Sequence, residues 1–536
     1  MGVSNELGAT MNRKLAAWIV PMALALAGCA SLSWEKNPPL PPGGKVVGTP
    51  YTLASVPDST GEEYVVLFAF SGGGKRSASF GYGALEAAHE IAMPSNSTLA
   101  DQIDVVSGVS GGSFTASAFA LYHDALFDGP LVDPQGVRHP SYKDFLDSNT
   151  NAAILAIYLE PWRWQWLANR HIGTNDEMEA TYEGALFGET TYKDLAGRGR
   201  PYLVVQATDL DAQQPFTFTQ TDFDLICSDL SAVKLSRAVA ASNGFPVLFS
   251  PIGLEMYSYP MSVAGDGPPD PNGSCPDLPW KHPGASYPAF SREALLANRA
   301  DLYAPPGMSK DEPSFVHLAD GGLSDNLALR GMISIWTRLK MQIPDRCFAG
   351  MPPGVEAEAC ATLNGIHLDK VKHILVVSVD GEAEPDRSEG INVPVLGGLS
   401  RITGSVLNSV IDSANLSTLP LVADATEGLR RSIWSLKCQQ TGIAAEDCKT
   451  PPDNFLPDAM FAHVSLSDWA KKNPDKGRDI ANSPTGLSLR AGDAAKLIEA
   501  GREALKSDPN VNCFLRNAGA APVGPVANDC PAAVEE

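Results

Sequence analysis

The chain has 536 residues, of which 44% are hydrophobic and 19% charged, and its formal net charge is −22. This length and apolar content are typical of a large folded core, and the negative charge argues against nucleic acid as a partner, because phosphate backbones attract basic proteins. The 48 glycines and 42 prolines indicate many ordered loops. We therefore expect one large α/β domain with loop insertions and a smaller C-terminal addition.

Residues 1–28 have the pattern of a signal peptide. Arg13 and Lys14 precede an apolar stretch over 15–27, which is too short to span a bilayer comfortably. The following Leu-Ala-Gly-Cys resembles the bacterial lipoprotein box, in which Cys29 would be lipidated and become the mature N-terminus. Ala30 is not the aspartate that favours inner-membrane retention, so we expect an outer-membrane lipoprotein of the bacterial envelope. A simple secretory signal, or an N-terminal helix with an incidental cysteine, is the alternative.

The net charge bears on how such a protein would reach a membrane. Removal of residues 1–28 takes away one acidic and two basic side chains and leaves a net charge of −23. Attachment would therefore come from acyl chains on Cys29 rather than from a basic patch. Residues 29–62, rich in proline and glycine, are expected to form a tether between the anchor and the domain.

The first strand-turn-helix unit starts at Tyr64. An apolar run over 64–70 predicts a buried strand, and Ser71-Gly72-Gly73-Gly74-Lys75-Arg76-Ser77 leads into a predicted helix over 80–91. Three successive glycines before a helix can direct their N–H groups toward one negatively charged oxygen. A nucleotide-binding P-loop is the competing interpretation, but Ala69 and Arg76 break its pattern.

The second unit contains G-x-S-x-G. A predicted strand over 103–107 is followed by Gly108, Ser110 and Gly112, and then by a predicted helix over 113–122. Glycines on both sides of Ser110 allow the chain to turn sharply, so that the hydroxyl projects from the sheet edge at a helix N-terminus. This context predicts a nucleophile, whereas an idle serine in a glycine-rich turn is the alternative.

The middle of the chain contains a cluster of aromatic residues over 155–169, with Tyr158, Trp162, Trp164 and Trp166. Core packing is the favoured interpretation, and a lipid interface beside the site is the alternative. Strands are predicted over 201–208 and 215–220, and residues 257–313 are expected to form a long loop insertion.

A third chemical element follows a short predicted strand over 315–318. Asp320 stands before Gly321 and Gly322, and a carboxylate at a strand end with glycines behind it can approach another backbone closely. Asp-Gly-Gly is otherwise a common turn. Further on, strands are predicted over 373–380 and 460–466 and a helix over 399–411. We place the catalytic domain at 63–425 and a C-terminal extension containing disulfides at 426–536.

The cysteines other than Cys29 are even in number, which suggests disulfides in an exported chain, and their spacing has no metal-binding C-x-x-C pattern. Nearest-neighbour pairing closes four loops outside the strands. The predicted pairs are Cys227–Cys275, Cys347–Cys360, Cys438–Cys448 and Cys513–Cys530.

A triple glycine followed by a basic residue, then G-x-S-x-G, then a distant D-G-G, resembles in this order the patatin-like phospholipase family. The segment 238–251 also resembles the alanine- and serine-rich helix and turn of that family. The resemblance covers roughly residues 63–410, with one departure at Ser77, where the family has glycine. It implies a three-layer α/β/α fold with a mainly parallel central sheet and a nucleophile elbow.

The resemblance also implies the roles of individual residues and a lipid substrate at a membrane. Ser110 would be the nucleophile and Asp320 its base in a dyad without histidine, while Gly72, Gly73, Gly74 and Arg76 would form the oxyanion hole. Gly108 and Gly112 would shape the elbow, and Gly321 and Gly322 the D-G-G turn. No metal or cofactor is implied. An α/β-hydrolase would instead need His367, His373 or His463 in a triad, and a non-catalytic envelope lipoprotein is the remaining alternative.

Overall fold

The computed structural model describes residues 35–41, 50–56, 63–164, 171–246, 248–257, 294–296, 298, 303, 315–342, 370–382, 399–440, 443, 447–449, 456–480, 483 and 485–530. The signal peptide, Cys29 and most of the loop insertion expected at 257–313 lie outside these ranges. Among the described residues, no helix is both long and apolar enough to cross a membrane.

An eight-stranded mixed sheet forms the centre of the molecule, in the order β12-β11-β1-β4-β7-β10-β9, with β8 paired to β7. The strands from β12 to β7 are parallel to one another, whereas β8 and β10 run antiparallel to β7. The strands are β1 (Tyr64–Phe70), β4 (Ile103–Val109), β7 (Tyr202–Asp209), β8 (Gln214–Thr217), β9 (Ile252–Glu255), β10 (Phe315–Asp320), β11 (His373–Asp380) and β12 (Asp458–Ser465).

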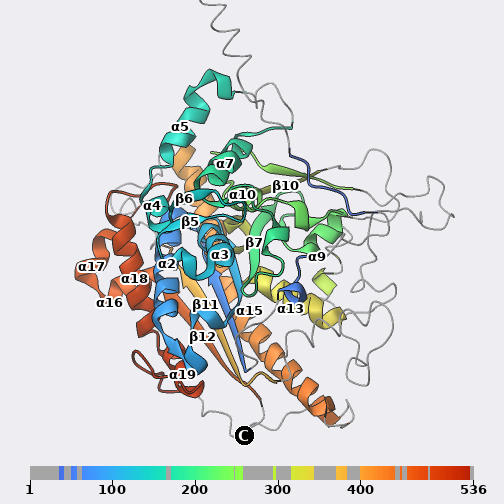
Figure 1. Cartoon of the computed structure of the whole chain (residues 1–536), viewed down its shortest axis with the longest axis vertical. Coiled ribbons are helices and arrows are strands. Elements are labelled where there is room, and N and C mark those ends of the chain that lie inside the picture. Colours follow the sequence, from blue (N-terminus) through green and yellow to red (C-terminus); the bar gives the residue numbers. More distant parts are fainter. Residues whose placement is uncertain are drawn as a thin grey trace, which may run out of the picture.

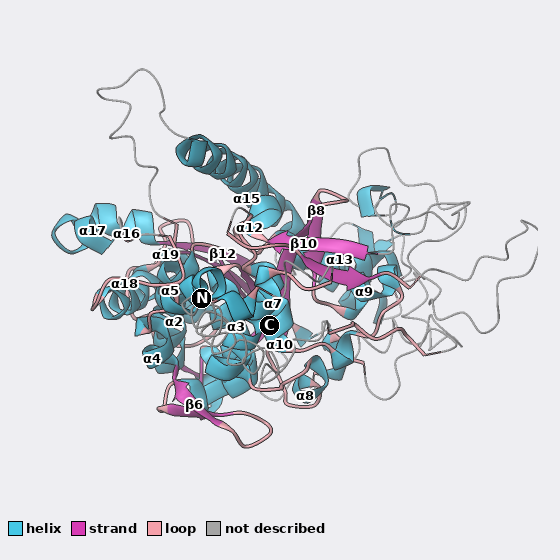
Figure 2. Cartoon of the chain, turned by 90° about the horizontal axis from the view of Figure 1, so that it is seen from above, coloured by secondary structure: helices cyan, strands magenta, loops and turns pink. Residues whose placement is uncertain are grey.

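Helices cover both faces of this sheet, as Figure 2 shows from above, with α15 on one side and α2, α3 and α10 on the other. The longer helices are α2 (Gly74–Glu90), α3 (Gly111–Tyr122), α5 (Asn151–Leu159), α7 (Thr174–Tyr182), α10 (Leu235–Ser242), α13 (Arg330–Gln342), α15 (Leu399–Gln440), α18 (Asp493–Ser507) and α19 (Pro509–Asn517). The shorter ones are α4 (Tyr142–Asp147), α8 (Tyr192–Leu195), α9 (Gln220–Phe223), α12 (Gly322–Asp325), α16 (Leu466–Lys472) and α17 (Pro474–Ile480). Two small hairpins, β2 (Ala92–Met93) with β3 (Ser97–Thr98) and β5 (Pro130–Val132) with β6 (Arg138–Ser141), lie outside the sheet.

The alternation of side chains along β1 explains the layers. Phe70 contacts the helix layer that contains α2, where a Cβ on Gly81 would stand 2.9 Å from its ring. Val65 and Leu67 point to the opposite layer and line a cavity of about 100 Å³ together with Met332 of α13 and Leu429 of α15. Both faces of the sheet are thus apolar, which is why its parallel strands are near-continuous hydrophobic runs. The predicted three-layer α/β/α fold is confirmed.

The C-terminal residues belong to this same fold rather than to a separate extension. The expected boundary between 425 and 426 falls inside α15, which continues past the predicted end at residue 411 and through Pro420. Val422 and Ile433 of α15 are buried, so tertiary packing maintains the helix beyond the proline. Beyond it, β12 pairs in parallel with β11, and α18 packs along α2 (Figure 1).

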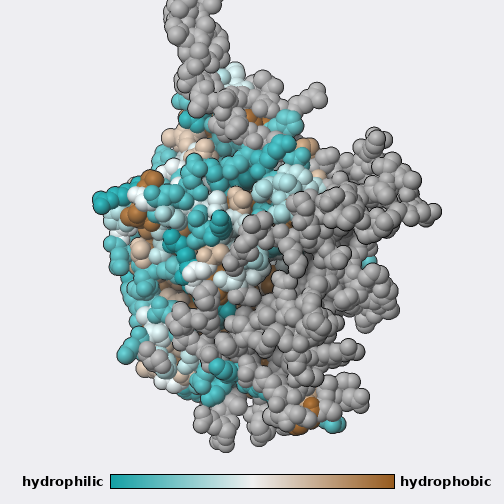
Figure 3. Space-filling model, turned by 45° about the vertical axis from the view of Figure 1, so that its right-hand side comes forward, coloured by the Kyte–Doolittle hydropathy of each residue, from teal (hydrophilic) through white to brown (hydrophobic). Residues whose placement is uncertain are grey.

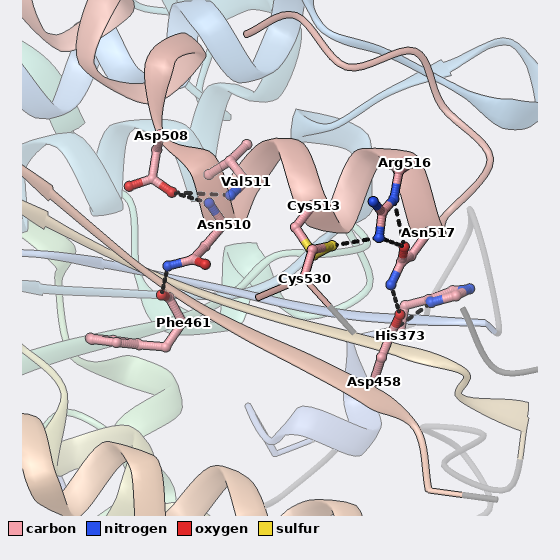
Figure 4. Close-up of a disulfide and its surroundings, with 10 residues drawn as sticks. All are labelled: His373, Asp458, Phe461, Asp508, Asn510, Val511, Cys513, Arg516, Asn517 and Cys530. Atoms are coloured by element: carbon pink, nitrogen blue, oxygen red, sulfur yellow. Dashed lines mark hydrogen bonds and ion pairs between the residues drawn. A yellow bond between two sulfur atoms is a disulfide. The ribbon is translucent and has the colours of Figure 1, made fainter. Parts of the chain in front are cut away.

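Figure 4 shows how α19 is fixed at the β12 edge of the sheet. Asn510 donates a hydrogen bond to Phe461 O at 2.9 Å, Asn517 donates one to Asp458 Oδ2 at 2.6 Å, and a disulfide joins Cys513 to Cys530. The predicted pairs Cys438–Cys448 and Cys513–Cys530 are confirmed. Cys227 is also disulfide-bonded, while Cys275, Cys347 and Cys360 lie outside the described residues.

The expected tether is packed against the domain wherever it is described. Leu40, Tyr51 and Val56 are each 1% exposed, and the Leu203 N–H donates to the Tyr51 hydroxyl at 2.7 Å. Pro39 forms a β-bridge with Ser228. Because these apolar side chains are buried, residues 35–41 and 50–56 are part of the folded domain.

The expectation that the aromatic cluster after α3 packs in the core is wrong for its described side chains. Tyr158 is 38% exposed and Trp164 40% exposed. Most of the described surface on the face shown in Figure 3 is hydrophilic.

Candidate active site

Ser110 lies at a strained turn between β4 and α3. Its φ of 48° and ψ of −124° are unusual for a residue with a side chain, and such a conformation costs on the order of 1–3 kcal/mol. A Cβ on Gly112 would stand 2.2 Å from Phe70 O, and a Cβ on Gly108 would stand 2.6 Å from Gly112 O. Both positions therefore require glycine, as expected for a nucleophile elbow.

Neighbouring serine and asparagine side chains hold this turn in place. The Ser110 N–H donates to Ser242 Oγ at 2.9 Å, and Ser242 Oγ donates to Gln206 O at 2.6 Å. On the other side, Ser113 Oγ donates to Ser110 O at 2.6 Å, and Asn243 Nδ2 donates to Ser113 Oγ at 3.0 Å. The sequence alone predicts no role for Ser242 and Asn243, although both lie in the segment 238–251 that resembles the helix and turn of the patatin-like family.

Asp320 lies directly against the Ser110 side chain. Ser110 Oγ donates to Asp320 Oδ2 at 2.9 Å, and the Gly322 N–H donates to Asp320 Oδ1 at 2.8 Å. Burial raises the pKa of Asp320 to about 6, although these two hydrogen bonds lower it. The carboxylate is thus more basic than an ordinary aspartate and is in hydrogen-bonding contact with a hydroxyl.

The turn after Asp320 approaches the elbow as closely as the sequence predicted. A Cβ on Gly321 would stand 2.3 Å from Val109 Cγ2 and 2.4 Å from Gln206 O. The N–H groups of Asp320 and Gly321 donate to Gly244 O and Ser242 O at 3.0 and 3.2 Å. The end of α10 and the residues after it therefore position both members of the pair, because carbonyls hold the turn at Asp320 and the Ser242 hydroxyl holds Ser110.

The triple glycine lies beside Ser110, but its three residues have different roles. A Cβ on Gly72 would stand 3.4 Å from Ser110 Cβ. The Gly72 N–H donates to Asn326 O at 2.9 Å, so this amide is occupied. Gly73 and Gly74 have φ values of 128° and 61°, which favour glycine. Within the described part of the chain, their N–H groups donate to no protein acceptor.

Two helix N-termini converge at this loop. α2 begins at Gly74 and α3 at Gly111, and a Cβ on Gly111 would stand 1.9 Å from Gly74 O. Helix N-termini present N–H groups and a partial positive charge. The amides of Gly73 and Gly74 are therefore the candidate donors to an oxyanion formed at Ser110.

The basic residues after the glycines support the loop from behind. Arg76 is buried, and its Nε and Nη1 donate to Gly381 O and Ser483 O, each at 2.8 Å. These bonds occupy two of its three guanidinium nitrogen atoms and give Arg76 a supporting role, while its place in the oxyanion hole stays a prediction. Lys75 Nζ, also buried, donates to Phe145 O and Ser148 O at 2.6 and 2.7 Å.

The departure at Ser77 has a simple structural explanation. Ser77 lies in α2, three residues after its start, and its Oγ donates to Ser71 O at 2.6 Å. Its φ is not positive. This position therefore needs no glycine, and the serine closes the loop with a hydrogen bond.

The histidines that a triad would need lie elsewhere. His373 begins β11 and is 2.8 Å from Asp458 at the start of β12, whereas Ser110 follows the carboxyl end of β4, roughly 20 Å along the sheet. His463 lies on the edge strand β12, 3.7 Å from Asp380. Among the described residues, no histidine hydrogen-bonds to Ser110 or Asp320, and His367 lies outside them. Within the same ranges, no cluster of His, Cys, Asp and Glu could hold a metal ion.

Residues 68–333 match the family model described as patatin-like phospholipase. The chain therefore carries a domain of the patatin-like phospholipase family. Among solved structures, human GIVD cytosolic phospholipase A2 in complex with methyl gamma-linolenyl fluorophosphonate is similar, with 13% identity, a TM-score of 0.38, and coverage of 85% of this chain and 60% of that chain. The same human enzyme alone gives 13% identity, a TM-score of 0.36, and coverage of 84% and 63%.

The chain thus spans about 60% of the length of these human structures. A comparison with curated proteins gave no significant match.

Replacement of Ser242 tests its role as a positioning residue. Ser242→Ala removes the acceptor of the Ser110 N–H, and we expect hydrolysis of a soluble p-nitrophenyl ester to fall about tenfold, as for loss of one buried hydrogen bond. Labelling of Ser110 by a fluorophosphonate should slow in parallel, with an unchanged pH profile. Ser236→Ala is the matched control, because Ser236 Oγ lies buried on the same helix and has no hydrogen-bond partner among the described residues. If Ser242→Ala and Ser236→Ala hydrolyse the ester at equal rates, Ser242 does not position Ser110.

Proposed function

We propose that this protein is a serine acyl hydrolase that cleaves fatty-acyl esters of phospholipids or related lipids with a Ser110–Asp320 dyad. The observation that carries the proposal is the 2.9 Å hydrogen bond from Ser110 Oγ to Asp320 Oδ2 at a nucleophile elbow. The patatin-like phospholipase domain over 68–333 supports the lipid class of the substrate. A non-catalytic envelope protein has no need of an activated serine, a raised carboxylate pKa and unoccupied loop amides in one place.

In the first half-reaction, Asp320 Oδ2 accepts the hydroxyl proton while Ser110 Oγ forms a bond to the ester carbonyl carbon. The negative charge that develops on the carbonyl oxygen is stabilised by the N–H groups of Gly73 and Gly74. When the tetrahedral intermediate collapses, the carbon–oxygen ester bond breaks and the protonated Asp320 returns the proton to the leaving alcohol. The products of this step are the alcohol and an acylated Ser110.

The second half-reaction repeats these steps with water. Asp320 accepts a proton from water, the hydroxyl oxygen attacks the acyl carbon, and the same loop amides stabilise the oxyanion. Collapse of the intermediate breaks the bond to Ser110 Oγ, which regains a proton from Asp320. A fatty acid is released and the free enzyme is restored. The proton transfers to and from Ser110 in both half-reactions use the Ser110–Asp320 pair, which is hydrogen-bonded at 2.9 Å.

Substitution of the dyad tests this proposal. Ser110→Ala and Asp320→Ala should each abolish fluorophosphonate labelling and lower ester hydrolysis by at least about a thousandfold, because nucleophile and base act as a unit. Ser117→Ala should remain at the parent level, because it removes a buried hydroxyl of α3 that has no hydrogen-bond partner in the described part of the chain. His373→Ala and His463→Ala should retain labelling, as should His367→Ala. Loss of labelling in one of the histidine variants would favour the triad instead.

The raised pKa of Asp320 predicts the acid side of the pH profile. A carboxylate base is active only when deprotonated, so kcat/KM for a soluble ester should rise with pH, with an apparent pKa of about 6, and then reach a plateau. The measurement is initial rates between about pH 4 and 9. An acid limb at the pKa of an ordinary aspartate, near 4, would contradict the assignment of Asp320 as the base.

We also propose that acyl chains on Cys29 anchor the protein to the outer membrane of a bacterial envelope. The proposal rests on the charged and apolar pattern of 1–28 and on the Leu-Ala-Gly-Cys sequence. Cells fed a radiolabelled fatty acid should incorporate it into the parent and not into Cys29→Ser, and only the parent should fractionate with outer membranes. Incorporation of the fatty acid into both the parent and Cys29→Ser would show that the lipid is attached at a residue other than Cys29.

A further inference from the structure

We infer that an exposed apolar surface around α5 is a docking site for a zwitterionic lipid surface. This α5 patch consists of large apolar side chains that are 38 to 65% exposed: Leu155, Tyr158, Leu159, Trp164 and Leu248. The inference rests on the proposed function, because the lipid surface that would bind to the α5 patch is the one that contains the lipid substrate.

The composition of α5 is unusual for a surface helix. The nine residues from Asn151 to Leu159 include no charged side chain, and of these only Ile157 is buried. A helix on a protein surface normally carries charged and polar residues on its outer face, whereas a helix that is apolar all round is normally buried in a core or a membrane. α5 is apolar on its outer face and stands in the open, so this face is suited to a hydrocarbon environment.

The polar atoms of the aromatic residues in the α5 patch are turned toward the protein. The Tyr158 hydroxyl donates to Leu248 O, and Trp164 Nε1 donates to Tyr158 O at 3.2 Å. The bond to Leu248 also ties the loop after α10 to α5. The exposed parts of both rings are therefore largely hydrocarbon, which is the part that tyrosine and tryptophan insert at a lipid interface.

The α5 patch is connected to the candidate active site through a short series of contacts. Figure 1 shows α5 projecting at the top of the molecule, above α7. α5 packs on α7, and α7 packs on α10, whose Ser242 accepts the Ser110 N–H. Leu248 follows four residues after Gly244, whose carbonyl accepts the Asp320 N–H. Along this series of contacts, α7 and α10 lie between the α5 patch and the Ser110–Asp320 pair.

A second connection runs through Lys75. This residue directly follows Gly74, and its Nζ donates to Phe145 O and to both the carbonyl and the hydroxyl of Ser148, at 2.6 to 2.8 Å. Ser148 precedes α5 by three residues. The start of α5 is therefore fixed to the loop of Gly72, Gly73 and Gly74, here called the oxyanion loop. Docking of α5 would position this loop relative to the lipid surface.

The charges around the α5 patch select the kind of lipid surface. Arg163 lies 2.9 Å from Glu160 and 3.4 Å from Glu177, so the charged groups beside the patch pair with one another. The whole chain has a net charge of −22. An anionic membrane would repel such a protein, whereas a zwitterionic surface does not oppose insertion of leucine and aromatic side chains.

The test uses the mature chain, residues 29–536, with Cys29→Ser, so that no acyl chain masks the contact. All described contacts lie within 35–530 and are retained. Co-sedimentation with phosphatidylcholine vesicles and hydrolysis of a soluble p-nitrophenyl ester are measured for the parent, Leu159→Glu and Leu159→Trp. Val523→Glu is the matched control, since Val523 is an apolar residue of 46% exposure that lies after α19, outside the α5 patch.

We expect the parent, Leu159→Trp and Val523→Glu to bind the vesicles equally within about twofold, and Leu159→Glu to bind about tenfold more weakly, because burial of one leucine side chain is lost. Ester hydrolysis should be equal in all four proteins. Equal vesicle affinity of Leu159→Glu and the parent would overturn the inference, as would a parent that binds only phosphatidylglycerol vesicles.

The parent could instead form a dimer that Leu159→Glu dissociates, with no vesicle binding by either protein. The α5 patch would then be assigned to contact with a second copy of the chain. A further outcome is a parent that binds vesicles through Leu159 and yet hydrolyses no ester. That result would disprove the proposed function but would still support the docking surface.

Discussion

The structure of the site depends on the close approach of two strand ends. Asp320 at the end of β10 reaches Ser110 only because the Gly321 backbone comes within a distance of Val109 and Gln206 that excludes any side chain at that position. A direct serine–carboxylate hydrogen bond needs this approach, since no imidazole lies between the two groups to span a longer gap. The register of the strands brings the two ends together, because Asp320 lies opposite Ala207 of antiparallel β7, one residue from Gln206, which lies opposite Val109 of parallel β4.

The same approach explains why the site is both strained and basic. The backbone at Ser110 is unfavourable on its own and is held by Ser242 and Ser113, while the Gly72 amide ties the loop of glycines to Asn326. Exclusion of water from Asp320 raises its pKa toward neutrality. Close packing therefore supplies the geometry of the nucleophile and the proton affinity of its base together.

The arrangement of helices around the site links the chemistry to a lipid surface. Lys75 fixes the start of α5 to the oxyanion loop, and α7 and α10 connect the rest of α5 to the elbow. The burial of a lysine ammonium is compensated by carbonyl acceptors, although burial still lowers its pKa to about 8. The apolar helix on the outside and the catalytic turn on the inside are thus connected through packed helices and buried hydrogen bonds.

The sequence by itself determined the elements whose cause is local. Apolar runs predicted β1 and β11 with their observed bounds, and the glycines around Ser110 and after Asp320 predicted the turns, because glycine at such positions has a steric reason that is readable in one segment. Only the tertiary structure decided that Gly72 and Arg76 support the loop, that Ser242 holds the nucleophile, that α15 continues past Pro420, and that Tyr158 and Trp164 remain exposed. These outcomes depend on partners distant in the chain, such as Asn326 for Gly72 and Gly381 for Arg76, and no local pattern encodes which distant carbonyl or side chain will lie within hydrogen-bonding reach.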